Sequence, residues 1–392
     1  MQPPADAIRE RSSRAIRQLA LCLAASAVVL AGCAPAPPAV AFHAAGNPER
    51  LADWGVLAVR AGRLVLAPGV ETYERNTPLF SDHAHKLRTL WLPPGKSARY
   101  TATGPFDFPV GTIVAKTFYY PRHGDGSPAE VSFTATAVSG AAKGDLALAA
   151  VRLVETRLLV RREEGWVALP YVWNEAQDEA VLARTGETVP LMGLAVPGEP
   201  AQPFDYQVPD VNQCAGCHAT DARRPALHPI GLAARHLNRV HDYPAGPENQ
   251  LGRLVRLGWL TDAPLLTEIP RAARWDDVSA PLADRARAYL DINCAHCHQP
   301  HGPADTSGLR LDAAAPSGAA IGLCKPPVAA GQGTGDRRFG IVPGHPEQSI
   351  LLYRMESSDP GAMMPEVGRS LVHVAGNRLI ADWIASLPGD CR

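Results

Sequence analysis

The sequence has 392 residues, of which 46% are hydrophobic and 20% are charged, and its formal net charge is −1. This length is sufficient for two or three domains that each bury a hydrophobic core. The balanced charge argues against a nucleic-acid-binding surface, and 34 Gly with 37 Pro, which follow no period, argue against long helical bundles.

The N-terminal residues have the pattern of an export signal. Several Arg residues precede an apolar run of 13 residues, 19–31, after which Gly32 and Cys33 follow. The run is shorter than the roughly 20 residues that cross a bilayer, so we expect cleavage rather than an uncleaved anchor. Leu-Ala-Gly-Cys resembles the bacterial lipoprotein box, which implies a lipid on Cys33, and Ala34 implies the outer membrane. We therefore expect a signal peptide at 1–32, a Pro/Ala-rich tether at 33–49 and a periplasm-facing lipoprotein.

Residues 50–200 are predicted to form an antiparallel, sandwich-like β-rich domain. Segments 111–120 and 152–160 contain the β-branched and aromatic residues that strands favour, and Gly and Pro separate such segments. His83 and His85 are two positions apart, so on a strand they would face the same side and could share a metal ion. A polar strand face or loop is the simpler interpretation of that pair.

Two pentapeptides of the form C-x-x-C-H match the attachment sequence of c-type haem. Their thiols are Cys214 and Cys217 in the first and Cys294 and Cys297 in the second. Two thiols at this spacing can reach the two vinyl groups of one haem, and the next residue can bind the iron, so His218 and His298 are the predicted proximal ligands. We therefore predict two covalently bound haem groups.

Zinc, a disulfide and a redox thiol pair are the alternatives for these pentapeptides. The two motifs are 80 positions apart, whereas the pairs of a zinc ribbon are about 15–20 residues apart. A redox C-x-x-C would occur once, and no His need follow it. The repeated motif with its own His therefore favours haem.

Two further cysteines, Cys324 and Cys391, are predicted to form a disulfide. Of the eight cysteines, Cys22 leaves with the signal and Cys33 carries the lipid, and the pentapeptides account for four. In an oxidising compartment a disulfide is favoured over two buried free thiols.

The C-terminal half is predicted to be mainly α-helical. In the first haem region, 201–275, helices are expected at about 231–240 and 247–260, with Pro247 at a helix start. The second region, 276–392, resembles a small cytochrome c domain, with a helix that leads into Cys294, another from Pro346 and a last one at about 375–387. The expected fold class is thus α+β and multidomain.

The sixth iron ligands are predicted to differ between the two haem groups. Met364 directly precedes a Pro ahead of the last helix, which is similar to the distal ligand of small cytochromes c and is preferred over Met363 and over simple packing. For the first haem an open sixth position is equally allowed. Its candidate distal ligands are His228, His236, His241 and Met192.

Beyond these motifs, the sequence resembles a family of exported bacterial diheme c-type cytochromes over nearly all of the mature chain. The matching segments are 73–82, 108–118, 155–160, 171–177, 229–231 and the two pentapeptides. Segment 343–349 and Met364-Pro365 also resemble cytochrome domains attached to periplasmic dehydrogenases. The resemblance implies haem binding at both pentapeptides and electron transfer.

We therefore expect a lipoprotein that relays electrons between a periplasmic donor and a periplasmic acceptor, with a dehydrogenase among the candidate partners. No catalytic residue is assigned. One alternative is a peroxidase-like or other oxidoreductase enzyme in which the first haem is open and the β-rich domain binds a substrate. Another is a module whose β-rich domain binds a partner protein or a polymer.

Overall fold

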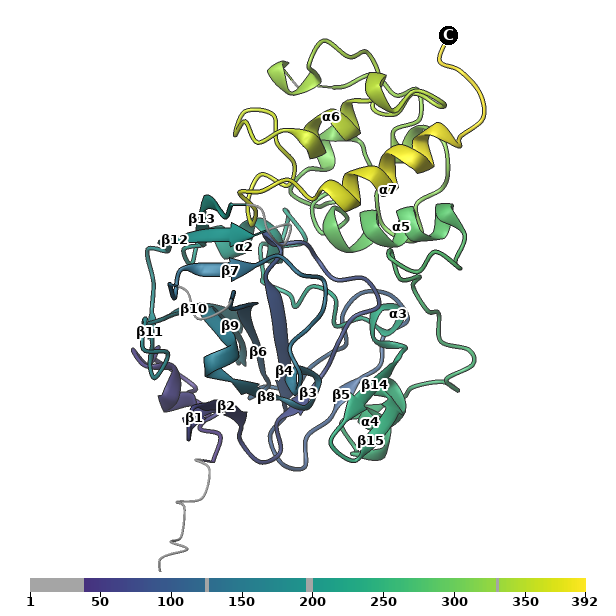
Figure 1. The fold of residues 1–392 in the computed structure, drawn as a ribbon. Coiled ribbons are helices and arrows are strands. Elements are labelled where there is room, and N and C mark those ends of the chain that lie inside the picture. The colour runs from purple at the N-terminus through teal and green to yellow at the C-terminus, as the bar shows by residue number, and fades with distance from the viewer. Residues whose placement is uncertain (1–38, 124–126, 195–199, 329–330) are drawn as a thin grey trace, which may run out of the picture. The chain divides into compact units, whose positions relative to one another are not determined.

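A six-stranded antiparallel sheet forms the centre of the N-terminal half (Figure 1). The structure is a computed structural model that describes residues 39–123, 127–194, 200–328 and 331–392. The strands, in spatial order, are β11 (Ala180–Leu182), β10 (Gly165–Trp173), β9 (Val151–Arg162), β6 (Ile113–Pro121), β4 (His85–Trp91) and β3 (Glu71–Thr72). The strands predicted at 111–120 and 152–160 correspond to β6 and β9 and are confirmed.

Both faces of this sheet are covered by other parts of the chain. Side chains alternate between the two faces along each strand, and apolar residues of β6 pack on both sides. In β6, Ile113 and Ala115 join a core with a second sheet, while Val114 and Phe118 join cores on the opposite face. The second sheet consists of β1 (Leu57–Arg60), β2 (Arg63–Leu66) and β8 (Asp145–Ala147). The opposite face is covered by residues 213–269 and by a third sheet of β13 (Gln202–Val208), β12 (Glu187–Leu194) and β7 (Glu130–Ser132).

The third sheet modifies the expected sandwich in two ways. Strands β12 and β7 pair in parallel, so the sheets are not purely antiparallel. Strand β13 pairs with β12 along its whole length and ends at Val208, so the β structure extends beyond residue 200. The mixed α+β class is confirmed, and the simple antiparallel sandwich is too narrow a description.

A β-bulge in β9 decides which of its residues face the later segments of the chain. The register between β6 and β9 shifts at Phe118, where Glu155 and then Leu153 are the successive partners, so Val154 is the extra residue. Leu153 and Leu158 therefore share one face although their positions differ in parity. Glu155, Arg157 and Leu159 consequently face the side on which the first pentapeptide lies.

Residues 39–49, which the sequence analysis assigns to the tether, belong to the β structure. Val40 and Phe42 pack against its core, and the amide of Ala41 donates to the Trp54 carbonyl at 2.9 Å. The expected export signal and the lipid site Cys33 lie outside the described residues.

The region after the first pentapeptide is less helical than predicted. It contains α3 (Ala234–Leu237), the hairpin β14 (Val240–Tyr243) with β15 (Gly246–Asn249), α4 (Gln250–Arg256), and β16 (Leu260–Thr261), which pairs in parallel with β5 (Ala98–Arg99). Pro247 lies in a two-stranded ribbon, where a missing N–H is tolerated, and does not start a helix. The helix begins after Asn249, whose side chain accepts from the amides of Leu251 and Gly252.

The C-terminal region is built around three helices, α5 (Leu282–Asn293), α6 (Ile350–Glu356) and α7 (Val374–Ala385). The helix that leads into Cys294 and the last helix are therefore confirmed, while Pro346 begins a 3₁₀ turn, Pro346–Gln348, ahead of α6. Tyr289 and Trp383 are among the side chains that fill the shared core. Cys324 and Cys391, the pair expected to be joined, form a disulfide with an S–S distance of 2.11 Å.

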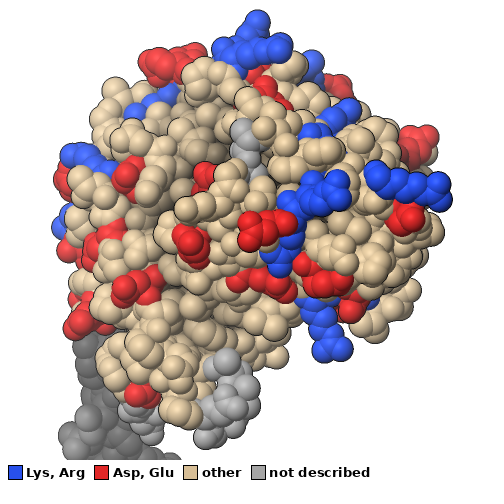
Figure 2. Space-filling model, turned by 90° about the horizontal axis from the view of Figure 1, so that it is seen from above, with Lys and Arg blue, Asp and Glu red and all other residues tan. Residues whose placement is uncertain are grey.

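No helix in the described part of the chain is both long and apolar enough to cross a bilayer. Figure 2 shows Lys and Arg side chains interspersed with Asp and Glu on the face that it presents. That face therefore carries no field of a single sign of the kind that nucleic acid requires.

Candidate cofactor sites

The two pentapeptides lie side by side although they are far apart in the sequence. The first is contained in α2 (Gln213–His218). The second begins at the C-terminal end of α5, where Cys294 is the C-cap residue. The Cys297 thiol donates to the Gly216 carbonyl at 3.4 Å, across a separation of 81 positions. Next to this contact, Gln299 Nε2 donates to the Thr220 carbonyl at 3.1 Å. Groups bound at the two pentapeptides would therefore be neighbours.

A cavity of about 520 Å³ opens beside the second pentapeptide. Its volume falls in the range of about 300–1,000 Å³ that is typical of cofactor and ligand pockets. Cys294, Cys297 and His298 line one side of it, and Met364 lines it as well. The cavity thus holds, in one place, the two thiols and both axial ligands predicted for the second haem.

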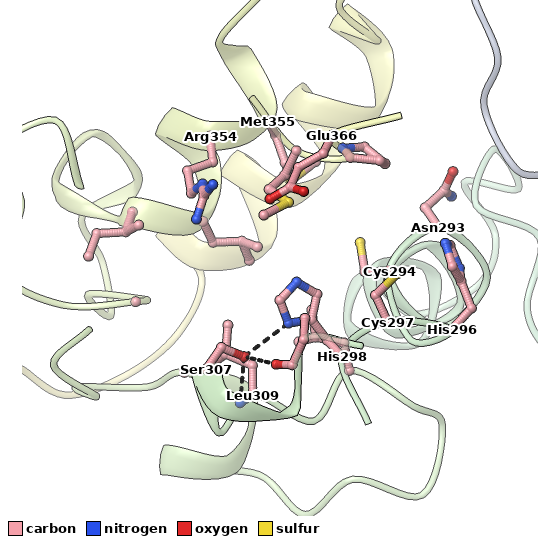
Figure 3. Close-up of a pocket in the computed structure, with 18 of the residues that line it drawn as sticks. Asn293, Cys294, His296, Cys297, His298, Ser307, Leu309, Arg354, Met355 and Glu366 are labelled. Carbon is pink, nitrogen blue, oxygen red and sulfur yellow. Dashed lines mark hydrogen bonds between the residues drawn. The ribbon is translucent and has the colours of Figure 1, made fainter. Parts of the chain in front are cut away.

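The imidazole of His298 is oriented for metal binding (Figure 3). Its Nδ1 lies 3.1 Å from the hydroxyl oxygen of Ser307, which itself donates to the Ala304 carbonyl at 2.7 Å. Since the hydroxyl hydrogen is used there, Nδ1 is the donor to Ser307, and Nε2 is left unprotonated. Burial lowers the pKa of His298 to about 4, which keeps the ring neutral. A neutral imidazole with a fixed tautomer is the form that binds iron.

The loop that carries Met364 is held by backbone contacts. The Met364 amide donates to the Arg354 carbonyl at 2.8 Å, and Arg369 donates to the Met364 carbonyl through Nη2 at 2.9 Å. Met363 is not part of the cavity lining, which agrees with the preference for Met364. Met355 on α6 also lines the cavity, but it is 7% exposed and belongs to the helical core.

A second cavity, of about 90 Å³, lies beside the first pentapeptide and is lined by Cys214, Cys217 and His218. It is smaller than a haem requires, but Cys217, Asn293 and His296 line both cavities, so the two spaces share a wall. His218 Nδ1 lies 2.7 Å from the His228 carbonyl and must be the donor, which leaves Nε2 free. Burial, followed by the charges of nearby groups, lowers the pKa of His218 to about 3.

Four cationic side chains line this smaller cavity: Arg75, Lys116, Arg157 and Arg369. Arg157 is paired with the buried carboxylate of Glu155 at 2.5 Å. Arg75 is 4% exposed, and its Nε and Nη1 have no hydrogen-bond partner among the described residues. Burial lowers the pKa of Arg75 to about 10 and that of Lys116 well below its ordinary value. A buried guanidinium with unpartnered N–H groups, as in Arg75, fits an anionic group such as the haem carboxylates.

Gly231 makes room for one of these cations. Its φ is +81°, and a Cβ at this position would lie 2.5 Å from Arg75 Nη1. A side chain would therefore push the guanidinium out of its place beside the cavity. These cations could not be predicted from the sequence, because Arg75 lies outside the strands and the pairing of β6 with β9 brings Lys116 and Arg157 together.

The four expected distal ligands of the first haem do not line either cavity. His228 contributes only its backbone carbonyl, which accepts a hydrogen bond from His218 Nδ1. His236 is buried with Nε2 3.3 Å from an Asp291 carboxylate oxygen, and Met192 lies in β12.

The last of these candidates, His241, is also engaged elsewhere. Its Nε2 lies 3.0 Å from the Thr72 hydroxyl and 2.9 Å from the Ala142 carbonyl. None of the four candidate side chains therefore lines the cavity beside His218, whereas a different histidine, His296, does.

The chemistry of the four pentapeptide thiols weighs against the redox-pair alternative. All four are free cysteines in the structure. Burial raises the pKa of both Cys294 and Cys297 to about 12, and it also raises the pKa of Cys214 and Cys217. Reactive and redox-active cysteines have lowered pKa values instead.

His83 and His85 do not lie together on one strand, which is the premise of the alternative metal site. Asp82 and His83 adopt positive φ values of 48° and 63°, so the chain turns there and β4 begins only at His85. His83 stacks on Phe133, whereas His85 bonds the Thr134 carbonyl at 2.9 Å. Among the residues that the structure describes, no group of three or more His, Cys, Asp or Glu side chains is placed to hold a metal ion.

Comparison with known proteins adds no assignment to this geometry. No protein family, no curated protein and no solved structure matches the chain.

Proposed function

We propose that the chain is a diheme c-type cytochrome that relays electrons between a donor and an acceptor in the periplasm. One haem is attached through Cys214 and Cys217 and the other through Cys294 and Cys297. The observation that carries the proposal is the contact between the two pentapeptides, in which Cys297 Sγ lies 3.4 Å from the Gly216 carbonyl. Two redox groups held as neighbours inside one protein are the arrangement that an electron relay needs.

When bound, haem supplies the redox chemistry, and the protein sets its potential and its access to water. In the second site, His298 and Met364 are the proposed axial ligands, and a thioether ligand raises the reduction potential. In the first site, His218 is the proposed proximal ligand, and Arg75 and Lys116 are the proposed partners of the haem carboxylates. Unlike surroundings give the two groups unlike potentials, which favours a relay over two equivalent stores.

The disulfide between Cys324 and Cys391 supports export. Disulfides persist in oxidising compartments and are rare in the cytosol. Together with the N-terminal signal pattern, this supports the proposal of a periplasm-facing lipoprotein anchored through Cys33.

The proposal is tested by expressing the full chain, with its export signal, in a bacterial host that attaches haem c. Denatured protein is expected to keep two haem groups by mass spectrometry and by the pyridine haemochrome spectrum. Cys214→Ser with Cys217→Ser, and separately Cys294→Ser with Cys297→Ser, are each expected to remove one attached haem.

Cys324→Ser with Cys391→Ser is the matched control, because it also removes two cysteines but is expected to leave both haem groups attached. Protein that carries no covalent haem, or that carries zinc at the pentapeptides, would overturn the proposal. A redox titration is expected to give two reversible one-electron steps.

A further inference from the structure

The first pentapeptide supplies one axial ligand, His218, and the walls of its cavity limit what can supply a second one. The side chains there that can bind iron through nitrogen are His296 and Lys116, besides His218 itself. His296 comes from the second pentapeptide, where it lies between Cys294 and Cys297. Its position in the sequence gives no hint of a role at the first site.

Besides His236, whose Nε2 lies beside the Asp291 carboxylate, His296 is the buried histidine whose Nδ1 lacks a hydrogen-bond partner among the described residues. His296 is 8% exposed. By contrast, the rings of His218, His241 and His373 each bond a carbonyl or a hydroxyl group. A buried polar ring without partners costs stability unless a ligand satisfies it.

The ring of His296 also points away from the second site. Figure 3 shows His296 and Asn293 on the side of the chain opposite to His298. His296 lines the shared wall of both cavities. Its ring is thus close to the first proposed iron site while its backbone belongs to the second.

We propose that His296 binds the iron of the haem attached to Cys214 and Cys217, on the face opposite His218. The inference rests on the proposed function, since it assigns a ligand to one of the proposed haem groups. Neutral imidazole is a common iron ligand and would satisfy the unpartnered ring. The first haem is then closed by two imidazoles, so it transfers electrons and has no open position for a substrate.

This assignment ties the two sites to one short stretch of chain. The turn from Cys294 to His298 would attach the second haem, supply its proximal ligand and supply the distal ligand of the first. A change of the second pentapeptide would therefore alter the first site through His296. Bis-imidazole ligation also places the first haem at a lower potential than the thioether-ligated second one.

The test begins with the unmodified, fully loaded protein. Low-temperature electron paramagnetic resonance and near-infrared magnetic circular dichroism of the oxidised form are expected to give two low-spin irons, one with two imidazoles and one with imidazole and thioether. A high-spin iron, or a signature of amine ligation from Lys116, would overturn the inference. Loss of covalent haem would instead overturn the proposed function, so the two failures are distinguishable.

Variants then assign the ligand. His296→Ala is expected to convert one of the two irons to the high-spin form, and added imidazole is expected to restore the low-spin form. His228→Ala is the matched control: it removes a side chain that lines neither cavity and keeps the carbonyl that bonds His218, so it is expected to leave both irons low-spin. If His296→Ala does not load haem, His296→Met provides the second variant, and it is expected to give two thioether-ligated irons. Unchanged spectra of a loaded His296 variant would contradict the assignment.

Discussion

The two candidate sites differ in how much of the chain each one needs. The thiols, both proposed axial ligands and the loop contacts of the second site come from residues 294–369, within the region that resembles a small cytochrome c. The first site draws its thiols and His218 from α2, most of its cations from the strand region, and His296 from the second pentapeptide. The difference teaches that the second site takes its proposed ligands from one continuous region, whereas the first needs residues from distant parts of the chain.

The largest expected effect tests this one-sided dependence. Removing the second attachment site with Cys294→Ser and Cys297→Ser is expected to disturb the remaining haem, because His296 lies between the changed residues. Removing the first with Cys214→Ser and Cys217→Ser is expected to leave the other haem with its imidazole and thioether ligands. Mass spectrometry counts the attached haem groups, and electron paramagnetic resonance reports the spin state of the iron that remains.

Equal effects of the two double variants on the remaining haem would contradict the proposed dependence of the first site on the second pentapeptide. The sites would then be either independent or mutually required.

The second expected effect concerns the potential of the second haem alone. Met364→Ala removes the thioether and is expected to lower that potential by on the order of 0.1 V, within the roughly 0.8 V span that axial ligands control. Met363→Ala is the matched control and is expected to have little effect, because Met363 does not line the cavity. A redox titration followed by absorbance measures both, and equal shifts in the two variants would contradict the assignment of Met364.

The contrast between the sites also explains which parts were predictable from the sequence. The pentapeptides, Met364 and the helices α5 and α7 of the C-terminal region follow local spacing rules, so they could be predicted. The partners of His218 could not, because Arg157 reaches the site through a β-bulge and Lys116 through strand register. His296 could not be predicted either, because in the sequence it lies inside the second pentapeptide, and only the tertiary packing brings it to the cavity beside His218.

A third prediction concerns the attachment of the Met364 loop to the β structure. The Asp82 carboxylate, 2% exposed, accepts from the amides of Ser370 at 2.8 Å and Leu371 at 2.7 Å. Asp82→Asn tolerates the positive φ but removes the charge and one acceptor, so we expect a loss of about 2–3 kcal/mol in the free energy of unfolding.

Ser370→Ala is the control for Asp82→Asn, because it keeps the amide and loses only a side-chain bond to the Asp205 carbonyl. It is expected to cost at most about 1 kcal/mol. Chemical denaturation measures both variants, and a smaller loss for Asp82→Asn than for Ser370→Ala would show that the loop is not held through Asp82.

The smallest expected effect is a pH dependence at the same contact between the two regions. His373 stacks on Phe80 with ring centroids 4.3 Å apart, and its Nδ1 lies 2.9 Å from the Tyr289 hydroxyl. Burial lowers the pKa of His373 to about 3. The unfolded chain therefore binds a proton near pH 6.5 that the folded protein does not, so stability present above this pH is lost as the pH falls.

For one such group the loss between pH 7.5 and 5.5 is about 1.4 kcal/mol. His373→Phe keeps the stacking but cannot be protonated, so its free energy of unfolding is expected to fall by about 1.4 kcal/mol less than that of the unmodified protein over this range. The lost bond to Tyr289 lowers stability by about 1 kcal/mol at every pH, and this offset separates the two effects. If the free energies of unfolding of the two proteins changed in parallel with pH, His373 would bind its proton as readily in the folded protein as in the unfolded chain. The contact between the regions would then be open to water.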